Sequence, residues 1–283
     1  MPKRLFIGLV ALAASLGFAS LAQAQTAVCD ALESPKKEVA AELLDTLHSY
    51  GCCDGTLRTC LQSSPSCSVP QRLANEVCRR IGRGEEREAV EHAIDLRTRS
   101  MTSTAAPVPI DLSSTQIAGD ATALVTAVVY ACGRCRFCAG MEPRLYELVT
   151  TGALQGKVRL AVRPFPIRSH TGSTEAGLGM IAAERLGNLW GFLHELYKNY
   201  DSFDPAKLPD YADAAGIDAT AFRAQLADPS TRSRLVASKK EGTRNKVDAT
   251  PTMFINGRPW LGQMSLELVQ DVLEEAVEKA RTP

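Results

Sequence analysis

The chain has 283 residues, and its 32 lysine and arginine residues are balanced by 32 aspartate and glutamate residues. This balance argues against a strongly basic nucleic-acid-binding surface and against a polybasic membrane patch. The length is too great for a small scaffold held only by disulfides, and it allows two domains.

The first 24 residues have the pattern of a secretory signal peptide. Lys3 and Arg4 are basic, residues 5–18 are apolar, and residues 22–24 (AQA) supply a small-x-small cleavage site. The apolar run is short for a membrane span, and a retained N-terminal anchor is the alternative. No cysteine follows the expected cut, so no lipid anchor is predicted, and the mature protein is expected to be soluble. Export would place the nine cysteines in an oxidising compartment, where structural disulfides persist.

The cysteines fall into two groups, which suggests two domains. We expect a Cys-rich helical domain at residues 25–101 and a linker at residues 102–109 (TSTAAPVP), whose small residues and prolines are typical of linkers. Six cysteines can form three disulfides in 15 ways, and adjacent Cys52 and Cys53 are expected to have different partners. A second redox or metal site is the alternative to structural disulfides, but no histidine spacing there supports zinc. The front group is Cys29, Cys52, Cys53, Cys60, Cys67 and Cys78.

The front segment has helical patterns. Ser34-Pro35 is typical of a helix start, and Gly51 is expected to end that helix. Pro70 predicts the start of another helix, and residues 85–100 predict a third. Short helices bury little surface on their own, so disulfides are expected to stabilise them.

The rear segment, residues 110–283, alternates between strand and helix patterns. Residues 124–130 and 157–163 are predicted strands, with a helix between them at 138–151. A strand, a helix and a parallel strand in this order form a βαβ unit.

Residues 173–246 then turn helical. Strand patterns return at 252–255 and 258–261 around Asn256-Gly257, a strong hairpin signal. Residues 266–280 predict a closing amphipathic helix. One apolar stripe of the helical segment, assigned to the core, is Leu189, Trp190, Leu193, Leu196 and Tyr197.

The most informative motif is a run of three cysteines, Cys132, Cys135 and Cys138, directly after the first predicted strand of the rear segment. A Cys-x-x-Cys where a strand leads into a helix is typical of a redox-active dithiol. The run holds two overlapping pairs. A nucleophilic Cys132 would require the helix to begin one turn earlier, which Gly133 disfavours.

Several motifs occur in a specific order over roughly residues 108–283. The motifs are Tyr130, Cys135-Arg136-Phe137-Cys138, Glu142-Pro143, Arg163-Pro164-Phe165-Pro166 with His170, Leu189-Trp190, and residues 249–257 (ATPTMFING). Together they resemble the DsbA-like branch of secreted thiol–disulfide oxidoreductases. The resemblance implies an α/β, thioredoxin-like fold with an inserted helical domain at about residues 173–246. It does not cover the front segment, whose cysteines and helical patterns predict a small disulfide-rich all-α domain before this fold. Arg136 replaces the usual proline of the dithiol loop, and Cys132 is outside the common pattern.

The position of Glu142-Pro143 relative to Cys138 in that family favours Cys135/Cys138 as the catalytic pair. Cys135, the predicted nucleophile, would lie at a helix N-terminus, where unpaired N–H groups and the helix dipole favour the thiolate. Cys138, one turn inside, is the predicted resolving thiol. Arg134 and Arg136 are expected to favour the thiolate by charge, and Glu142 is expected to tune proton transfer at Cys138.

Other residues near the motif have open or structural roles. Cys132 is a buried cysteine, a partner for a front cysteine, or an auxiliary redox thiol. The resemblance implies that Pro251 is cis, so that the Thr250 backbone can pair with an extended substrate. His170 and His194 are expected to be structural.

The leading hypothesis is a periplasmic or otherwise exported enzyme that oxidises reduced or misoxidised exported proteins and is recycled by a membrane redox partner. It needs no cofactor, metal or nucleic acid. A disulfide reductase or isomerase is the alternative of the same fold, because about 150 mV separates thioredoxin (about −270 mV) from DsbA (about −120 mV) and sequence does not fix the potential. A thiol-based metal-binding or chaperone-like module, holding copper(I) or zinc, is the alternative from another class.

Overall fold

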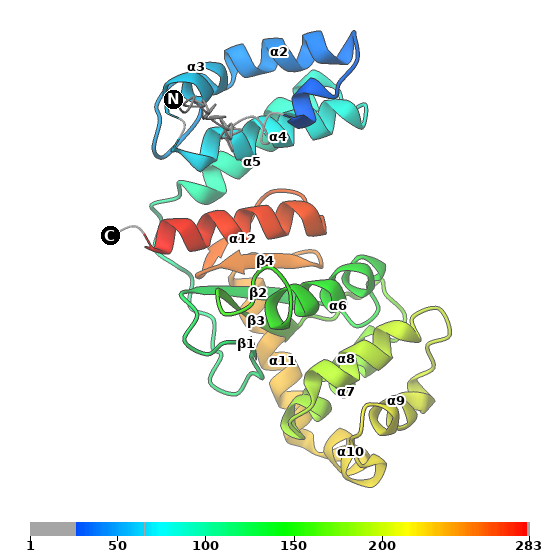
Figure 1. Ribbon diagram of the computed structural model, residues 1–283. Coiled ribbons are helices and arrows are strands. Elements are labelled where there is room, and N and C mark those ends of the chain that lie inside the picture. Colours follow the sequence, from blue (N-terminus) through cyan, green and yellow to red (C-terminus); the bar gives the residue numbers. More distant parts are fainter. Residues whose placement is uncertain (1–26, 65, 282–283) are drawn as a thin grey trace, which may run out of the picture.

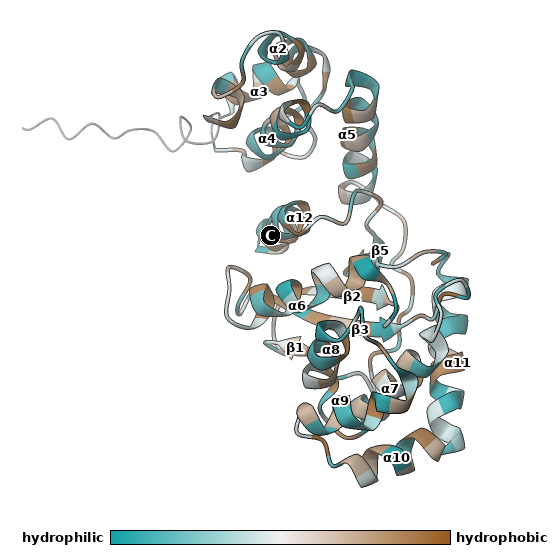
Figure 2. Cartoon of the chain, turned by 90° about the vertical axis from the view of Figure 1, so that its right-hand side faces the viewer, coloured by the Kyte–Doolittle hydropathy of each residue, from teal (hydrophilic) through white to brown (hydrophobic). Residues whose placement is uncertain are grey.

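The computed structural model describes residues 27–64 and 66–281, so the predicted signal peptide lies outside the described residues. A helical front part and an α/β rear part have separate hydrophobic cores. The last helix, α12 (Leu266–Arg281), lies between the front helices and the sheet (Figure 1 and Figure 2).

The front part packs its helices around Leu43, Leu57, Leu73 and Val77, all fully buried. The three predicted helices are present, although the first begins after Pro35 and the second begins before Pro70. The first also ends at Thr46 and not at Gly51, because Leu47 already has an extended backbone. Helix α3 was not predicted, although the Thr56 hydroxyl caps its N-terminus by accepting from the Thr59 N–H at 3.3 Å. The helices are α2 (Lys36–Thr46), α3 (Leu57–Ser63), α4 (Ser68–Gly82) and α5 (Arg87–Met101).

Disulfides hold these short helices together. The pairs are Cys29–Cys78, Cys52–Cys67 and Cys53–Cys60. The adjacent Cys52 and Cys53 therefore have different partners, as predicted. Because all front cysteines are paired with one another, none of them is the partner of Cys132.

The rear part contains a five-stranded mixed sheet in the order β1-β3-β2-β4-β5. Strands β2 and β3 are parallel, with Val125 opposite Val158 and Tyr130 opposite Arg163, and the other pairs are antiparallel. The predicted βαβ unit is β2–α6–β3. The elements are β1 (Ala118–Gly119), β2 (Val125–Ala131), α6 (Arg136–Thr150), β3 (Val158–Pro164), β4 (Thr252–Ile255) and β5 (Arg258–Pro259).

Strand β2 shows how the sheet separates two cores. Val125, Ala127 and Val129 belong to the large core that includes residues of α6 and α12. Val128 and Tyr130 belong to a smaller core on the opposite face. This alternation follows from the two-residue period of a strand. A strand buried on both faces reads as a continuous apolar run, as the sequence LVTAVVY does.

The predicted helical insertion is present between β3 and β4, and the predicted closing helix is α12. The Asn256-Gly257 turn has positive φ at both residues (48° and 76°), as a type I′ hairpin requires. The insertion consists of α7 (Ser173–Arg185), α8 (Leu189–Lys198), η1 (Pro205–Lys207), α9 (Leu208–Ala214), α10 (Ala219–Ala227) and α11 (Pro229–Arg244).

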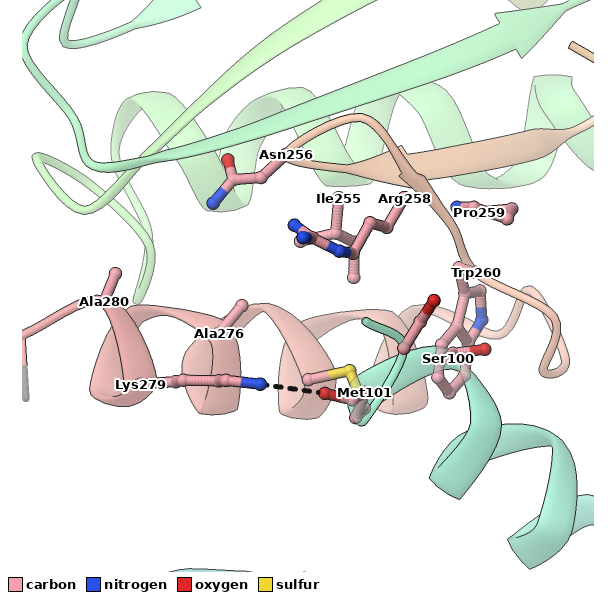
Figure 3. Close-up of a pocket in the computed structure, with 11 residues that line it drawn as sticks. Ser100, Met101, Ile255, Asn256, Arg258, Pro259, Trp260, Ala276, Lys279 and Ala280 are labelled. Carbon is pink, nitrogen blue, oxygen red and sulfur yellow. Dashed lines mark hydrogen bonds between the residues drawn. The ribbon is translucent and has the colours of Figure 1, made fainter. Parts of the chain in front are cut away.

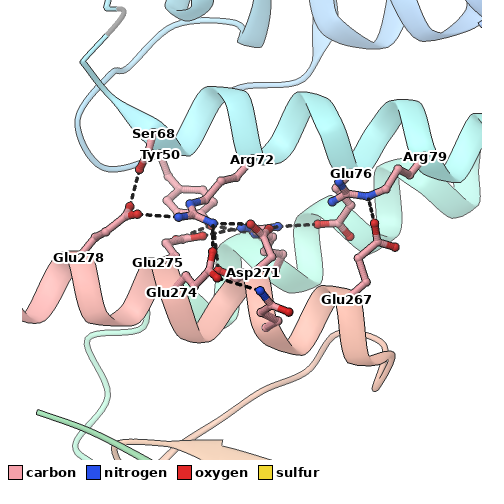
Figure 4. A network of polar contacts seen from close by, with 12 residues as sticks. Tyr50, Ser68, Arg72, Glu76, Arg79, Glu267, Asp271, Glu274, Glu275 and Glu278 are labelled. Atoms are coloured by element: carbon pink, nitrogen blue, oxygen red, sulfur yellow. Dashed lines mark hydrogen bonds and ion pairs between the residues drawn. The ribbon is translucent and has the colours of Figure 1, made fainter. Parts of the chain in front are cut away.

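A polar network joins the two parts (Figure 4). Arg97 of α5 is fully buried and donates to Glu76 of α4 at 2.8 Å, Asp271 of α12 at 2.7 Å and Glu275 of α12 at 2.6 Å. Arg72 of α4 also contacts Asp271. A buried charge is tolerated only when it is paired, so Arg97 fixes the front helices onto α12.

The predicted linker, residues 102–109, has no regular helix or strand. Its end runs along the hairpin, where the Val108 N–H donates to the Gly257 carbonyl at 2.9 Å. A cavity of about 250 Å³ lies between the end of α5, the hairpin and α12, and the Lys279 ammonium there donates to the Met101 carbonyl at 3.0 Å (Figure 3). None of the three free cysteines lines this cavity.

Candidate active site

The three free cysteines lie at the junction of β2 and α6. Helix α6 begins at Arg136 with Cys135 as its N-cap residue, so Cys138 lies in the first turn. The Cys135 N–H donates to the Cys132 carbonyl at 3.0 Å and closes a turn before the helix. The helix therefore begins two residues before the predicted range of 138–151, and the positive end of the helix dipole is at Cys135.

Gly133 allows this turn to pack closely against the helical insertion. A Cβ atom at this position would lie 2.8 Å from the Ala176 Cβ of α7 and 2.9 Å from the Leu196 Cδ2 of α8. Any other residue would push these helices away from the cysteines. The glycine thus holds α7 and α8 against the dithiol.

Exposure does not distinguish the three thiols, but their electrostatics do. Cys132, Cys135 and Cys138 are 1%, 2% and 0% exposed. The pKa of Cys135 is lowered to about 5. The largest cause is the hydrogen bond that the Cys138 thiol donates to the Cys135 sulfur, and burial acts in the opposite direction. Burial raises the pKa of Cys138 well above its ordinary value. At neutral pH Cys135 is thus a thiolate and Cys138 a thiol, as a nucleophile and its resolving partner require.

Cys132 is a third thiol in the same core. Burial raises its pKa, while the backbone N–H of Arg134 donates to its sulfur at 3.4 Å. Cys135 acts on it electrostatically, so the two sulfurs are neighbours. Cys132 is therefore a neutral, buried thiol beside Cys135.

Beneath the thiols lies a buried acid, Glu142 of α6, which is 1% exposed. Neither of its carboxylate oxygens has a hydrogen-bond partner among the described residues. Burial, with a smaller contribution from the negative charge of Cys135, raises the pKa of Glu142 to about 8. Glu142 therefore carries a proton at neutral pH, and it lies within the electrostatic reach of Cys135.

The loop before β4 contacts Cys135. The Thr250–Pro251 peptide bond is cis, as the resemblance implied. The Cys135 thiol, when protonated, donates to the Thr250 carbonyl at 3.2 Å. Thr250 and Pro251 are both partly exposed, so this loop offers backbone to a segment that approaches Cys135.

The two arginines beside Cys135 have different surroundings. The Arg134 guanidinium donates to the Tyr200 carbonyl at 2.6 Å and lies over the rings of Tyr200 and Phe203. It holds the loop after α8 close to the dithiol turn. Arg136 is exposed, and Phe137 beside it is 70% exposed, so these side chains present charge and apolar surface next to Cys135. That the arginines lower the pKa of Cys135 stays a prediction.

The two histidines do not contact the sulfur atoms through any hydrogen bond seen among the described residues. The backbone N–H of His170 donates to the Ile167 carbonyl at 3.0 Å, in the loop before α7. His194 is exposed and lines a cavity of about 430 Å³ that Glu142 also lines. Within residues 27–64 and 66–281, no three histidine, cysteine or acidic side chains are placed to hold a metal ion.

One buried residue near the thiols was missed by sequence reasoning. Tyr197 belongs to the stripe assigned to the core, and it is buried, but its hydroxyl has no hydrogen-bond partner among the described residues. A tyrosine within an otherwise apolar helical stripe is the signal that could have found it, because a buried hydroxyl normally has a partner.

Comparisons with known proteins agree with this architecture. A protein family described as Thioredoxin matches residues 112–275. The solved structure of BdbD from Bacillus subtilis is similar with a TM-score of 0.51 and 17% identity, over 63% of this chain and 98% of that one. The thiol-disulfide exchange protein alpha-DsbA2 from Wolbachia pipientis has the same TM-score and 18% identity, over 65% and 94%. At these identities the likeness shows a common fold.

Among curated proteins, the chain matches longer ones. It is 30% identical over 175 residues to the Na(+)/H(+) antiporter NhaA 3 of Salinispora tropica, and 28% identical over 174 residues to the antiporter NhaA of Herminiimonas arsenicoxydans. The matches cover 62% of this chain but 26% and 27% of those proteins. The chain thus spans about a quarter of their length. In the described part of this chain, no helix is both long and apolar enough to cross a membrane.

Proposed function

The chain belongs to the thioredoxin family, and we propose that it is an exported thiol–disulfide oxidoreductase that acts as an oxidant of other exported proteins. The observation that carries the proposal is the split in acidity between Cys135 and Cys138 across the first turn of α6. A thiolate that is stable in the reduced protein is a good leaving group when a substrate disulfide is released.

The reaction follows from the positions of these groups. In the oxidised enzyme, a substrate thiolate attacks the Cys135 sulfur of a Cys135–Cys138 disulfide, and Cys138 leaves. Glu142, protonated at neutral pH, can give its proton to the Cys138 thiolate, whose own pKa is high. A second substrate thiolate then attacks the substrate sulfur of the mixed disulfide, and Cys135 leaves as a stable thiolate. The substrate gains a disulfide, and the enzyme keeps both electrons as two reduced cysteines.

The low pKa of Cys135 favours the oxidant direction. A stable thiolate stabilises the reduced form and makes the potential less negative. The corresponding thioredoxin cysteine has a pKa of about 7, so a value about two units lower corresponds to about 60 mV, at roughly 30 mV per 1.4 kcal/mol. We therefore expect a potential near −210 mV or higher, on the order of 60 mV above thioredoxin.

The test is the equilibrium of the Cys135/Cys138 pair with a glutathione buffer of known potential. A potential above about −230 mV, with catalysed oxidation of a reduced unfolded protein, supports the oxidant. A potential below about −250 mV would instead show a reductase. The Cys135→Ala variant is the control that has no Cys135/Cys138 pair to equilibrate.

Export and recycling are part of the same proposal. The front disulfides and the pattern of residues 1–24 support an oxidising compartment. Each turnover leaves the dithiol reduced, so a membrane redox partner must reoxidise it. Mature protein from an exporting host should begin at Gln25, and an intact Met1 terminus in the cytosol would contradict export.

A further inference from the structure

Tyr197 of α8 is a buried polar side chain that takes no part in the steps above. It lies in the same core as the three free cysteines and is 5% exposed. Its hydroxyl has no hydrogen-bond partner among the described residues. Buried hydroxyl groups are normally paired, so an orphan inside a core needs an explanation.

The groups that act electrostatically on this hydroxyl are the reacting groups. Helix α8 packs against α6, and Leu196, next to Tyr197, lies against the turn at Gly133. The ionisable groups that act on the hydroxyl are Cys138 and Glu142 first, and then Cys132 and Cys135. Both Glu142 oxygens are also without partners among the described residues. Helix α6 thus supplies a buried carboxyl group that has no hydrogen-bond donor among the described residues, and α8 supplies a buried hydroxyl that has no acceptor among them.

We propose that Tyr197 is a positioning residue whose hydroxyl donates a hydrogen bond to the Glu142 carboxylate once Glu142 has given its proton to Cys138. The inference rests on the proposed function, because the exchange reaction is what brings a thiolate to Cys138. The proton moves from the Glu142 carboxyl to the Cys138 sulfur, and no other bond changes in this step.

The physical reason is the cost of a charge in this site. An ionised carboxylate without hydrogen bonds is strongly disfavoured in a buried position. Burial raises the pKa of Tyr197, so the hydroxyl stays neutral and can donate while it keeps its proton. Hydrogen bonds of this kind are often long in the resting enzyme and shorten when the charge develops.

Other groups also face Glu142. Cys135 and Cys138 lie on its own helix, and Cys132 lies at the end of β2. From α8, Trp190, His194 and Glu195 line the cavity that Glu142 lines, and Glu195 is paired with Lys198 at 3.3 Å. The Trp190 indole N–H is a rival donor, because it is buried and also lacks a partner among the described residues. Tyr197 is favoured because the same hydroxyl neighbours both Cys138 and Glu142.

The direct test is an NMR titration of the Glu142 carboxyl carbon in the reduced, full-length mature protein. The wild type should titrate with a pKa of about 8. Tyr197→Phe removes only the hydroxyl and should raise this pKa by about one unit, because a hydrogen bond to the charged form favours that form. Tyr211→Phe is the matched control, since its buried hydroxyl accepts from the Asp204 N–H at 3.2 Å, and it should leave the titration unchanged.

An unshifted titration in Tyr197→Phe, or a shift in Trp190→Phe instead, would overturn the inference. If Tyr197→Phe does not fold, 3-fluorotyrosine at position 197 keeps the ring and is a stronger donor. It should move the Glu142 titration to lower pH, and no movement would again overturn the inference.

The rate of reduction of the oxidised enzyme by a small dithiol provides the second readout. This rate should fall as Glu142 loses its proton, and Tyr197→Phe should move that fall to higher pH. Glu142→Gln should abolish this fall in rate, and Tyr197→Phe should then have no further effect on the rate. If the wild type exchanges no disulfides but the Glu142 titration shifts, the proposed function fails and the hydrogen bond stands. If exchange is intact and the titration does not shift, only the inference about Tyr197 fails.

Discussion

The two parts of the molecule use the same amino acid for opposite purposes. In the front part, every cysteine of the described residues is locked in a disulfide that holds short helices together. In the rear part, three thiols are free and lie within one turn of a helix start. Cys67 is an N-cap residue like Cys135, yet it is bonded to Cys52. A helix N-terminus alone therefore does not make a cysteine reactive, and the groups around its sulfur decide whether it stabilises or reacts.

We expect the contact between the two parts to have a structural role. Arg97→Ala removes a buried ion pair from both Glu76 and Glu275, and leaves Glu76 with Arg80 and Glu275 with the Tyr50 hydroxyl, so it should lower the free energy of unfolding by about 3–5 kcal/mol. Chemical denaturation measures this. Arg99→Ala, an exposed arginine of the same helix, is the control and should cost under about 1 kcal/mol. An unstable Arg99→Ala or a fully stable Arg97→Ala would show that the buried network does not join the two parts.

Removing a front disulfide should change stability without changing exchange. The Cys29–Cys78 bond closes a loop with a sequence separation of 49, so the double alanine variant should lose about 4 kcal/mol. The Cys53–Cys60 bond spans 7 positions, and its removal should cost about 2 kcal/mol. Folded variants should oxidise substrate at the wild-type rate. A front variant that folds but does not oxidise substrate would show that the front disulfides are needed for exchange as well as for stability.

Replacing Glu142, the buried acid of the rear part, should stabilise the protein by an amount that depends on pH. The pKa of Glu142 is about 8 in the folded protein and about 4.5 when unfolded. Between about pH 4.5 and pH 8 the unfolded state loses this proton while the folded state keeps it, so the free energy of unfolding falls as pH rises. Glu142→Gln removes this penalty and should stabilise the reduced protein by about 3 kcal/mol at about pH 7, with no gain near about pH 4. Denaturation at both pH values measures the difference, and an equal gain at both would contradict it.

Replacing Cys132 tests whether this third free thiol is structural or reactive. Its raised pKa keeps it neutral at pH 7, so Cys132→Ala should change the rate of substrate oxidation by no more than about twofold. Stopped-flow kinetics with a fluorescent peptide substrate measure this rate. A loss of roughly tenfold or more would make Cys132 an auxiliary redox thiol.

Local sequence signals were sufficient for most of the rear part. The run LVTAVVY, the Asn256-Gly257 turn and the cysteine spacing each depend on neighbours in the chain, and β2, the hairpin and the N-cap at Cys135 are where these signals predicted them.

Features that depend on distant contacts could not be predicted in this way. Arg97 meets Asp271 across 174 positions, and the cysteine pairing was one of 15 possibilities. The grouping of Tyr197 with Glu142 depends on how α8 packs on α6, which the apolar stripe alone does not specify.

The central claim is that Cys135 attacks and Cys138 resolves. The most direct measurement is mixed-disulfide trapping in an exporting host, comparing Cys138→Ala with Cys135→Ala on non-reducing gels. Our account predicts trapped substrates with Cys138→Ala, sensitive to reductant, and none with Cys135→Ala. Equal trapping by Cys135→Ala, lost when Cys132 is also replaced, would make Cys132 the nucleophile and contradict the account.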